Sequence, residues 1–302
     1  MSSVWSSIGS RSTRETVVTM NDDPRNHGTS GAGAPNQGPA EERSLVPAIT
    51  RAAAIIDLLA AEGSAMGPNA IARRLKLPKS SVANICTTLV DTGLLRVLDG
   101  GVGLGQRLAQ LGAAYLGSVD QVRLFQESCG LLVAGANDTA QLAMLTDGIG
   151  VVYLAKRDGV YPVQLASTPG RTLPASCTAT GKAMLATLDA DDLHDRLSRA
   201  GALPQLTPKS VTSVKQLEAE LAKIKRCGYA LDEEEVIEGV VCVAVAIPRQ
   251  RRADPLLAVS LTLLKPRATK PTMVKLAQEL CEVTNAIALG LGVPVVRAPG
   301  TG

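Results

Sequence analysis

GPNAIARRLKLPKSSVANICTTLVDTGLLRVLDGGVGL, residues 67–104, carries the clearest secondary-structure signals in the N-terminal part of this chain. Its apolar residues recur at helical spacing on both sides of Leu77 and Pro78, which predicts one helix before this pair and a second helix after it. The pair separates the helices because the residue before a proline is pushed out of the helical region. Gly93 is typical of the position just past a helix end. We therefore expect two helices joined by a tight turn.

A β-hairpin is predicted directly after the second helix. Residues 94–98 and 101–104 are predicted strands, and the turn-forming sequence DGG joins them. Residues 46–62 form an amphipathic helix in front, which completes a domain of three helices and a hairpin. Two helices across a short turn, followed by a hairpin, are typical of a winged helix-turn-helix. The second helix of such a module enters the DNA major groove.

The charge of the chain is concentrated locally. The 302 residues carry a formal net charge of +3, which is too small to indicate a generally basic nucleic-acid-binding protein. Four cations nevertheless lie together in the helix-turn-helix: Arg73, Arg74, Lys76 and Lys79. They form the modest basic patch that a phosphate-contacting surface needs.

Composition bounds the remaining possibilities. The length predicts about two domains. Hydrophobic residues make up 45% of the chain and aromatic residues only 2%, so its cores are built from Leu, Val, Ala and Ile. Residues 1–43 are rich in Ser, Gly, Asn, Pro and charge, and they offer too little apolar surface to fold. We expect a disordered N-terminal tail there, with Met20 as an alternative start.

Cysteine spacing and hydropathy indicate the compartment. The six cysteines are scattered and include no closely spaced pair. This argues against a structural zinc site and against a disulfide framework, so we expect no metal, no cofactor and reduced thiols in a cytoplasmic protein. The N-terminus lacks the apolar core of a signal peptide, and no apolar run is long enough to span a bilayer. No membrane partner is expected.

The region after the hairpin mixes helices and strands. Residues 106–118 form a helix long enough to link two domains, and the second domain extends over residues 119–297, before a short tail at 298–302. Its predicted helices are 119–137, 177–188, 191–200, 214–227 and 273–291. Its predicted strands are 139–146, 150–155, 161–166, 239–247 and 256–264. This mixture over about 180 residues is typical of an α+β domain of sensor size.

Four segments, in order, resemble the IclR family of bacterial transcriptional regulators. They are LPKSSVANICTTLVDTGLL (77–95), GLGQRLAQLG (103–112), LPASCTATGKAMLA (173–186) and GYALDEEEVIEGVVCVAVAI (228–247). The resemblance implies a winged helix-turn-helix domain over residues 44–105, a linker helix and a GAF-like α/β effector-binding domain. It also implies a homodimer or homotetramer that binds a pseudo-palindromic double-stranded DNA operator and responds to a small molecule, often an organic acid.

The residues predicted to contact DNA come from the helix-turn-helix and the wing. The polar face of the second helix carries Lys79, Ser80, Ser81, Ala83, Asn84 and Thr87. Asn84 is the candidate base reader, because asparagine pairs bidentately with adenine. The family usually has an arginine at this position. Arg73, Arg74 and Lys76 are predicted phosphate contacts, and Arg96 braces the wing or touches the DNA backbone.

The resemblance implies effector contacts at eight positions: Leu173, Thr180, Gly181, Asp232, Val240, Cys242, Ser260 and Thr262. The residues themselves support part of this set. Ser260 and Thr262 are two apart, so they point to the same side of a strand and form a polar floor in an apolar sheet. A buried hydroxyl pair needs partners, which a ligand can supply. We expect the glutamates of residues 233–235 to be a solvated run.

The segment 173–186 also predicts a helix start, capped by Ser176 or Thr178. Helix N-termini bind anions, which suits a carboxylate effector. Its TGK sequence does not complete a phosphate loop, because that motif needs a glycine at position 176 and Ser or Thr at position 183. The scarcity of aromatic residues favours a small aliphatic or polar acid over a flat ring.

Enzyme chemistry is not expected. A cysteine nucleophile such as Cys177 or Cys242 needs a base, and the two histidines lie in the predicted tail and on a polar helix. We predict a cytoplasmic, sequence-specific repressor whose operator affinity a small organic acid controls. Two alternatives stay open: a regulator whose C-terminal domain serves oligomerisation only, and a small-molecule enzyme fused to a winged helix.

Overall fold

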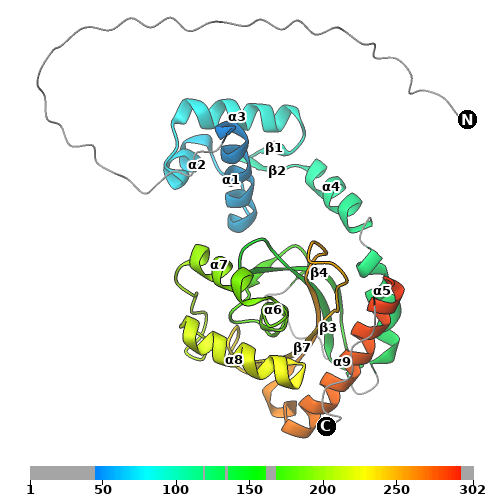
Figure 1. The fold of residues 1–302 in the computed structure, drawn as a ribbon. Helices are drawn as coiled ribbons and strands as arrows, with labels where there is room; N and C mark the ends of the chain where they lie inside the picture. The colour runs from blue at the N-terminus through cyan, green and yellow to red at the C-terminus, as the bar shows by residue number, and fades with distance from the viewer. Residues whose placement is uncertain (1–44, 118–119, 133–134, 161–167, 294–302) are drawn as a thin grey trace, which may run out of the picture. The chain divides into compact units, whose positions relative to one another are not determined.

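The computed structural model describes residues 45–117, 120–132, 135–160 and 168–293 (Figure 1). The predicted tails and the strand expected at 161–166 lie outside these residues.

Three helices and a two-stranded sheet follow in the order that the sequence predicts. They are α1 (Pro47–Glu62), α2 (Pro68–Leu75), α3 (Lys79–Asp91), β1 (Leu95–Leu98) and β2 (Gly101–Leu104). The two strands are antiparallel, with Leu95 opposite Leu104 and Leu98 opposite Gly101. The winged helix-turn-helix expected from residues 67–104 is therefore present.

A compact apolar core holds this domain together. The buried residues come from every element: Ile55, Leu59, Ile71, Ala72, Val82, Cys86, Leu89, Leu95 and Val102. The turn between α2 and α3 is closed by Lys76, whose left-handed backbone (φ 54°) ends α2. Gly101 allows the wing to lie against the backbone before α2, since a Cβ there would come within 2.2 Å of the Met66 carbonyl oxygen.

The helix predicted after the wing is α4 (Gln106–Gly117). The helix expected at 119–137 is shorter than predicted: α5 spans Asp120–Ser128, and a 3-10 turn follows over Cys129–Leu131. Two glycines, Gly130 and Gly135, lie in the remaining segment, and glycine opposes helix continuation by its backbone entropy.

The C-terminal region is built on a six-stranded antiparallel sheet with the order β5-β4-β3-β8-β7-β6. Its strands are β3 (Thr139–Leu145), β4 (Gly150–Arg157), β5 (Thr172–Pro174), β6 (Ala230–Glu233), β7 (Val240–Ala246) and β8 (Leu257–Leu264). The sequence predicted the four long strands. It missed the edge strands β5 and β6, which are too short to display a two-residue period.

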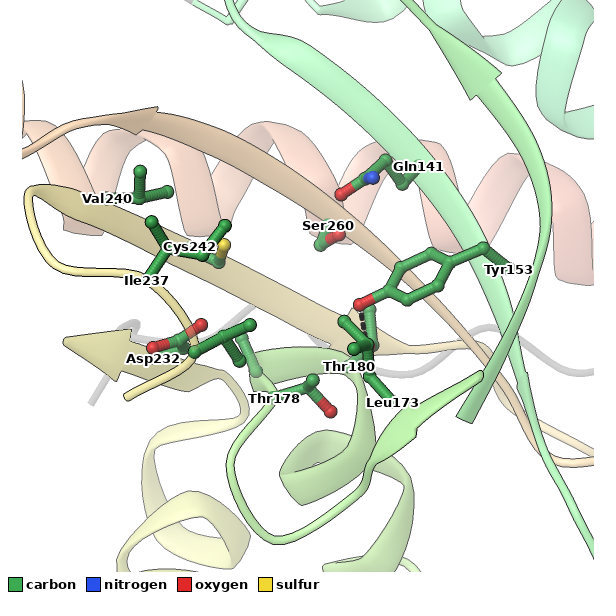
Figure 2. A pocket seen from close by; sticks show the side chains of 12 residues that line it. Gln141, Tyr153, Leu173, Thr178, Thr180, Asp232, Ile237, Val240, Cys242 and Ser260 are labelled. Atoms are coloured by element: carbon green, nitrogen blue, oxygen red, sulfur yellow. Dashed lines mark hydrogen bonds between the residues drawn. The ribbon is translucent and has the colours of Figure 1, made fainter. Parts of the chain in front are cut away.

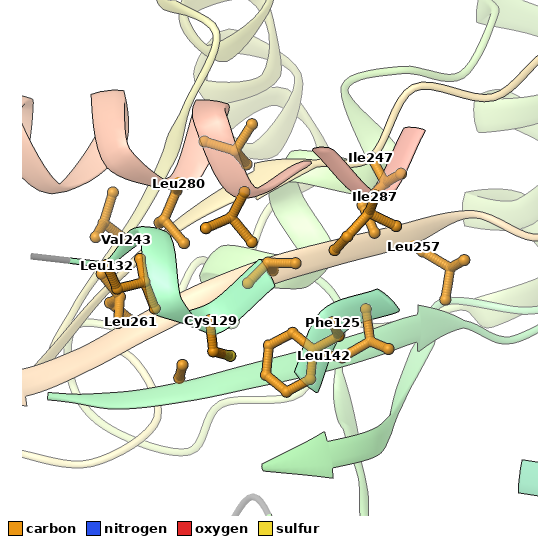
Figure 3. Close-up of a cluster of buried hydrophobic side chains, with 14 of the residues drawn as sticks. Phe125, Cys129, Leu132, Leu142, Val243, Ile247, Leu257, Leu261, Leu280 and Ile287 are labelled. Atoms are coloured by element: carbon orange, nitrogen blue, oxygen red, sulfur yellow. The ribbon is translucent and has the colours of Figure 1, made fainter. Parts of the chain in front are cut away.

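Helices cover both faces of this sheet. On one face lie α5 and α9 (Lys270–Gly290). Phe125 of α5 and Leu280 of α9 belong to the same apolar core as Leu142 of β3 (Figure 3). The other face carries α6 (Ala179–Leu185) and, outside it, α7 (Ala190–Ala200) and α8 (Val214–Cys227). Small residues of the sheet, among them Ala143, Ala244 and Ala258, lie in this second core and let α6 approach closely. Helix α6 is shorter than the predicted 177–188.

None of the helices in the described ranges combines the length and apolar character needed to cross a membrane.

Candidate functional site

A row of polar residues crosses the sheet on the face that α6 covers. Asp232 on β6 pairs with Cys242 on β7, and Cys242 pairs with Thr262 on β8. Ser260 lies two residues before Thr262 and pairs with Gln141 on β3. Side chains two apart on a strand share a face, so the polar floor predicted from Ser260 and Thr262 extends over four strands.

This row, together with the start of α6, encloses a pocket (Figure 2). The lining residues are Gln141, Tyr153, Leu173, Thr178, Ala179, Thr180, Asp232, Val236, Ile237, Val240, Cys242 and Ser260. The centres of water molecules can occupy about 20 Å³ of this pocket, which is room for one or two waters. The pocket therefore suits a ligand of few atoms unless its walls move.

The structure brings most of the predicted effector-binding residues together. Leu173, Thr180, Asp232, Val240, Cys242 and Ser260 line the pocket. Gly181 and Thr262 lie beside it: the N–H of Gly181 donates to Thr178 Oγ1 (3.1 Å), and Thr262 Oγ1 donates to Gln141 Oε1 (3.2 Å).

Six further lining residues were not predicted: Gln141, Tyr153, Thr178, Ala179, Val236 and Ile237. Gln141 is a polar residue in an otherwise apolar strand, which is a signal that the sequence offered. For Tyr153 and Ile237 we find no comparable signal, because they reach the pocket through the pairing of distant strands and the loop after β6.

The sequence predicts that Ser176 or Thr178 caps the start of α6. Thr178 is the N-cap residue. Tyr153 on β4 points at the same turn, with its hydroxyl 3.5 Å from Thr180 Oγ1. Burial raises the pKa of Tyr153 well above its ordinary value, so this hydroxyl is neutral at physiological pH and can donate a hydrogen bond.

Gly181 has a packing role in this turn. A Cβ at this position would lie 2.3 Å from the Ala175 Cα and 2.4 Å from the Ala175 carbonyl oxygen. Because both atoms belong to the backbone, neither can move aside cheaply. The segment before α6 therefore approaches the helix as closely as it does only with glycine at position 181.

We expect Gly181→Ala to lower the free energy of unfolding by about 1–3 kcal/mol through this overpacking. Chemical denaturation of the full chain measures the loss. Gly112→Ala is the matched control, since it also lies in a helix and its new Cβ would meet nothing within 4 Å. Equal effects of the two substitutions would contradict the packing role of Gly181.

Asp232 is the charged residue among the described residues that line the pocket, and only 3% of its surface is exposed. Its Oδ1 accepts the backbone N–H of Glu235 at 2.7 Å. Burial raises the pKa of Asp232 to about 6, although this hydrogen bond and the charge of Lys182 favour the ionised form. Burial likewise raises the pKa of the Cys242 thiol well above its ordinary value.

A buried ion pair lies behind Asp232. Lys182 on α6 is 2% exposed, and its Nζ contacts Glu235 and, at 2.9 Å, Glu220 Oε2 on α8. Burial alone would lower the pKa of Lys182, but the charges of Glu235 and Glu220 raise it, so the ammonium form persists. Burial raises the pKa of Glu235 to about 7.

The solvated run predicted at residues 233–235 is therefore partly wrong. Glu233 is exposed, Glu234 pairs with Lys209 and Lys265, and Glu235 is buried against Lys182. The prediction failed because the cation that pairs with Glu235, a residue of the loop after β6, belongs to α6, more than fifty residues earlier in the chain.

Helix α3 presents the predicted polar face to solvent. Lys79, Ser80, Ala83, Asn84 and Thr87 are exposed, as are Arg73, Arg74, Lys76 and Arg96. Ser81 is only partly exposed. Arg74 is engaged by Glu62, with 2.8 Å between Nη2 and Oε1. The Thr87 hydroxyl donates to the Ala83 carbonyl oxygen at 3.1 Å, which leaves it an acceptor for a further partner.

The comparisons with known proteins agree with this architecture. The model of the IclR helix-turn-helix domain matches residues 48–99, and the model of the bacterial transcriptional regulator IclR C-terminal domain matches residues 113–289. The HTH-type transcriptional regulator XynR of Escherichia coli (strain K12) is 29% identical over 254 residues, which cover 83% of this chain and 99% of that protein.

Solved structures give the same answer. The repressor BlcR of Agobacterium tumefaciens matches with a TM-score of 0.53 and 29% identity, over 83% of this chain and 99% of that one. An IclR homologue of Microbacterium hydrocarbonoxydans, solved with 4-hydroxybenzoate, matches with a TM-score of 0.64 and 24% identity, over 81% and 99%. The chain belongs to the IclR family of bacterial transcriptional regulators.

Proposed function

We propose that this regulator is a repressor that binds a pseudo-palindromic operator as a homodimer or homotetramer, and that a small organic acid in the pocket controls its affinity for DNA. In this proposal residues 44–105 bind DNA, and residues 119–297 bind the effector and the other subunits. Residues 106–118 form the helix that links these two domains. The protein acts in the cytoplasm and has no catalytic role. The observation that carries the proposal is the small polar pocket within an otherwise apolar core layer.

The chemistry of the pocket supports a small polar effector. Hydroxyl groups of Tyr153, Thr180 and Ser260 can each donate or accept a hydrogen bond. A structural relative was solved with 4-hydroxybenzoate, an organic acid. Control of DNA binding requires that the effector bind two arrangements of the protein with different affinity.

A thermal-shift screen of the full chain against organic acids tests the effector, because a ligand that binds the folded state raises its melting temperature. Asp232→Ala and Ser260→Ala are the pocket variants. A stabilising acid whose effect both variants lose, and which alters operator binding, is the expected result. If no acid stabilises the protein, the C-terminal domain serves oligomerisation only.

The DNA-binding residues make a separate prediction. Asn84→Ala is expected to relax base preference at one operator position by about 1–3 kcal/mol. Arg73→Ala is expected to weaken binding to all sequences alike and to reduce the salt dependence by about one phosphate contact. Binding to operator libraries at several salt concentrations separates the two effects. Arg199→Ala, an exposed cation on α7, is the control. An unchanged base preference in Asn84→Ala contradicts the role of Asn84.

A further inference from the structure

The surroundings of Asp232 carry more negative than positive charge. Lys182 is the cation that the structure places near Asp232, and its ammonium already contacts both Glu235 and Glu220. One cation thus serves three carboxyl groups. With every group ionised, the cluster carries two uncompensated negative charges in a site where Asp232 is 3% and Glu235 5% exposed. Buried charges of one sign are costly, so the cluster favours holding protons.

An ionised organic acid adds to the excess of negative charge around Asp232. Among the described residues, the pocket lining contains one carboxyl group and no cation. A carboxylate ligand that entered with Asp232 ionised would place two like charges in one small cavity. Two carboxyl groups that share a site resolve this conflict by sharing one proton.

We propose that this protein binds its acid effector together with one proton, which Asp232 holds and donates in a hydrogen bond to the effector carboxylate. The inference rests on the proposed function. The proton comes from solvent and returns to it when the effector leaves, so no covalent bond to carbon changes. Asp232 is placed for this role, because it lines the pocket while its Oδ1 stays fixed by the Glu235 N–H.

The groups that face Asp232 are compatible with proton uptake there. Cys242 on β7 and Tyr153 on β4 have raised pKa values and stay neutral, as does Cys177 before α6. The pKa of Asp232 itself is raised to about 6. Lys182 stays charged. Glu235, whose pKa is about 7, is the other group in the cluster that titrates near neutrality, and the test must separate it from Asp232.

Acetate, propionate and 4-hydroxybenzoate are the probes, titrated into the full chain with labelled methyl groups. Ile237 and Val240 line the pocket and report occupancy. One proton taken up per ligand predicts that Kd weakens by about tenfold for each pH unit, from about pH 6.5 to about pH 8.5. Acids of this kind are ionised throughout this range.

Two neutral isosteres identify the group that takes up the proton. Asp232→Asn can donate a hydrogen bond from its amide N–H without taking up a proton from solvent. Its affinity for the acid should therefore be independent of pH and tighter than that of the native protein at about pH 8.5. Glu235→Gln, the matched control, should keep the pH slope. A role of Asp232 in folding alone predicts no gain of affinity at high pH.

The experiment distinguishes a failure of proton uptake by Asp232 from a failure of the proposed organic acid effector. An acid that binds the native protein with no pH slope overturns proton uptake and leaves the proposed function standing. A slope that Asp232→Asn keeps, or that Glu235→Gln removes, assigns the proton to another group and also overturns the inference. If none of the probes binds at any pH, the organic acid effector itself is wrong, and this inference falls with it.

Discussion

Replacing Lys182 by methionine is expected to lower the free energy of unfolding by about 3–5 kcal/mol at about pH 8. Methionine keeps the apolar stem of the side chain and removes the ammonium. Glu235, 5% exposed, would then hold a buried charge with no cation beside it, and its Oε2 already lacks a hydrogen-bond partner among the described residues. Removing one partner of a buried ion pair costs far more than the pair contributes.

The loss should depend on pH with a definite sign. The pKa of Glu235 is raised from 4.5 to about 7, so between these values the folded state holds a proton that the unfolded state releases. The contribution of Glu235 to the free energy of unfolding is therefore greatest below about pH 4.5 and falls as the pH rises to about 7. Without Lys182 the fall continues to higher pH. Lys182→Met should accordingly cost less at about pH 6 than at about pH 8.

Denaturant unfolding at about pH 6 and about pH 8 measures the loss of unfolding free energy in Lys182→Met. The control is the double variant Lys182→Met with Glu235→Gln, which removes the charges of both members of this pair and should be more stable than Lys182→Met alone. A loss below about 1 kcal/mol at about pH 8, or a loss equal at both pH values, contradicts the description of Lys182 and Glu235 as a buried pair.

Phe125→Ala is expected to lower the free energy of unfolding by about 3–5 kcal/mol. Phe125 is the single phenylalanine of the chain and is fully buried. It joins α5 to the sheet and α9, in a core that also contains Leu142, Leu257 and Ile287 (Figure 3). The remaining side chains of this core are aliphatic or small, so none can fill the space that the ring leaves.

Phe125→Leu is the matched control, since it keeps most of the apolar volume and should cost clearly less. Both variants are measured by denaturant unfolding of the full chain. Because the pocket lies on the other face of the sheet, acid binding by any folded fraction should be retained. A loss below about 1 kcal/mol for Phe125→Ala would show that this core collapses around the missing ring.

The winged helix-turn-helix was predictable because its signals are local. Pro78, Gly93 and the DGG turn end or begin elements through their own backbone restrictions, and the apolar spacing in between sets the helix faces. The long strands β3, β4, β7 and β8 were predictable for the same reason. The edge strands β5 and β6 were not, because three or four residues show no period and form strands only by pairing with a neighbour.

The residues of the pocket likewise fall into a set that local sequence predicts and a set that it does not. The polar pair Ser260 and Thr262 and a cap at Ser176 or Thr178 could be predicted from the local sequence, and family resemblance supplied the positions of Asp232 and Cys242. The choice of Thr178 as the cap, the completion of the lining by Tyr153 and Gln141, and the pairing of Lys182 with Glu235 follow from the tertiary fold alone. These residues are far apart in the chain, and the sheet order β4-β3-β8-β7-β6 with α6 across it brings them together. The charge state of Asp232 follows from that assembly, because burial and neighbouring charges set a pKa and neither is written in the local sequence.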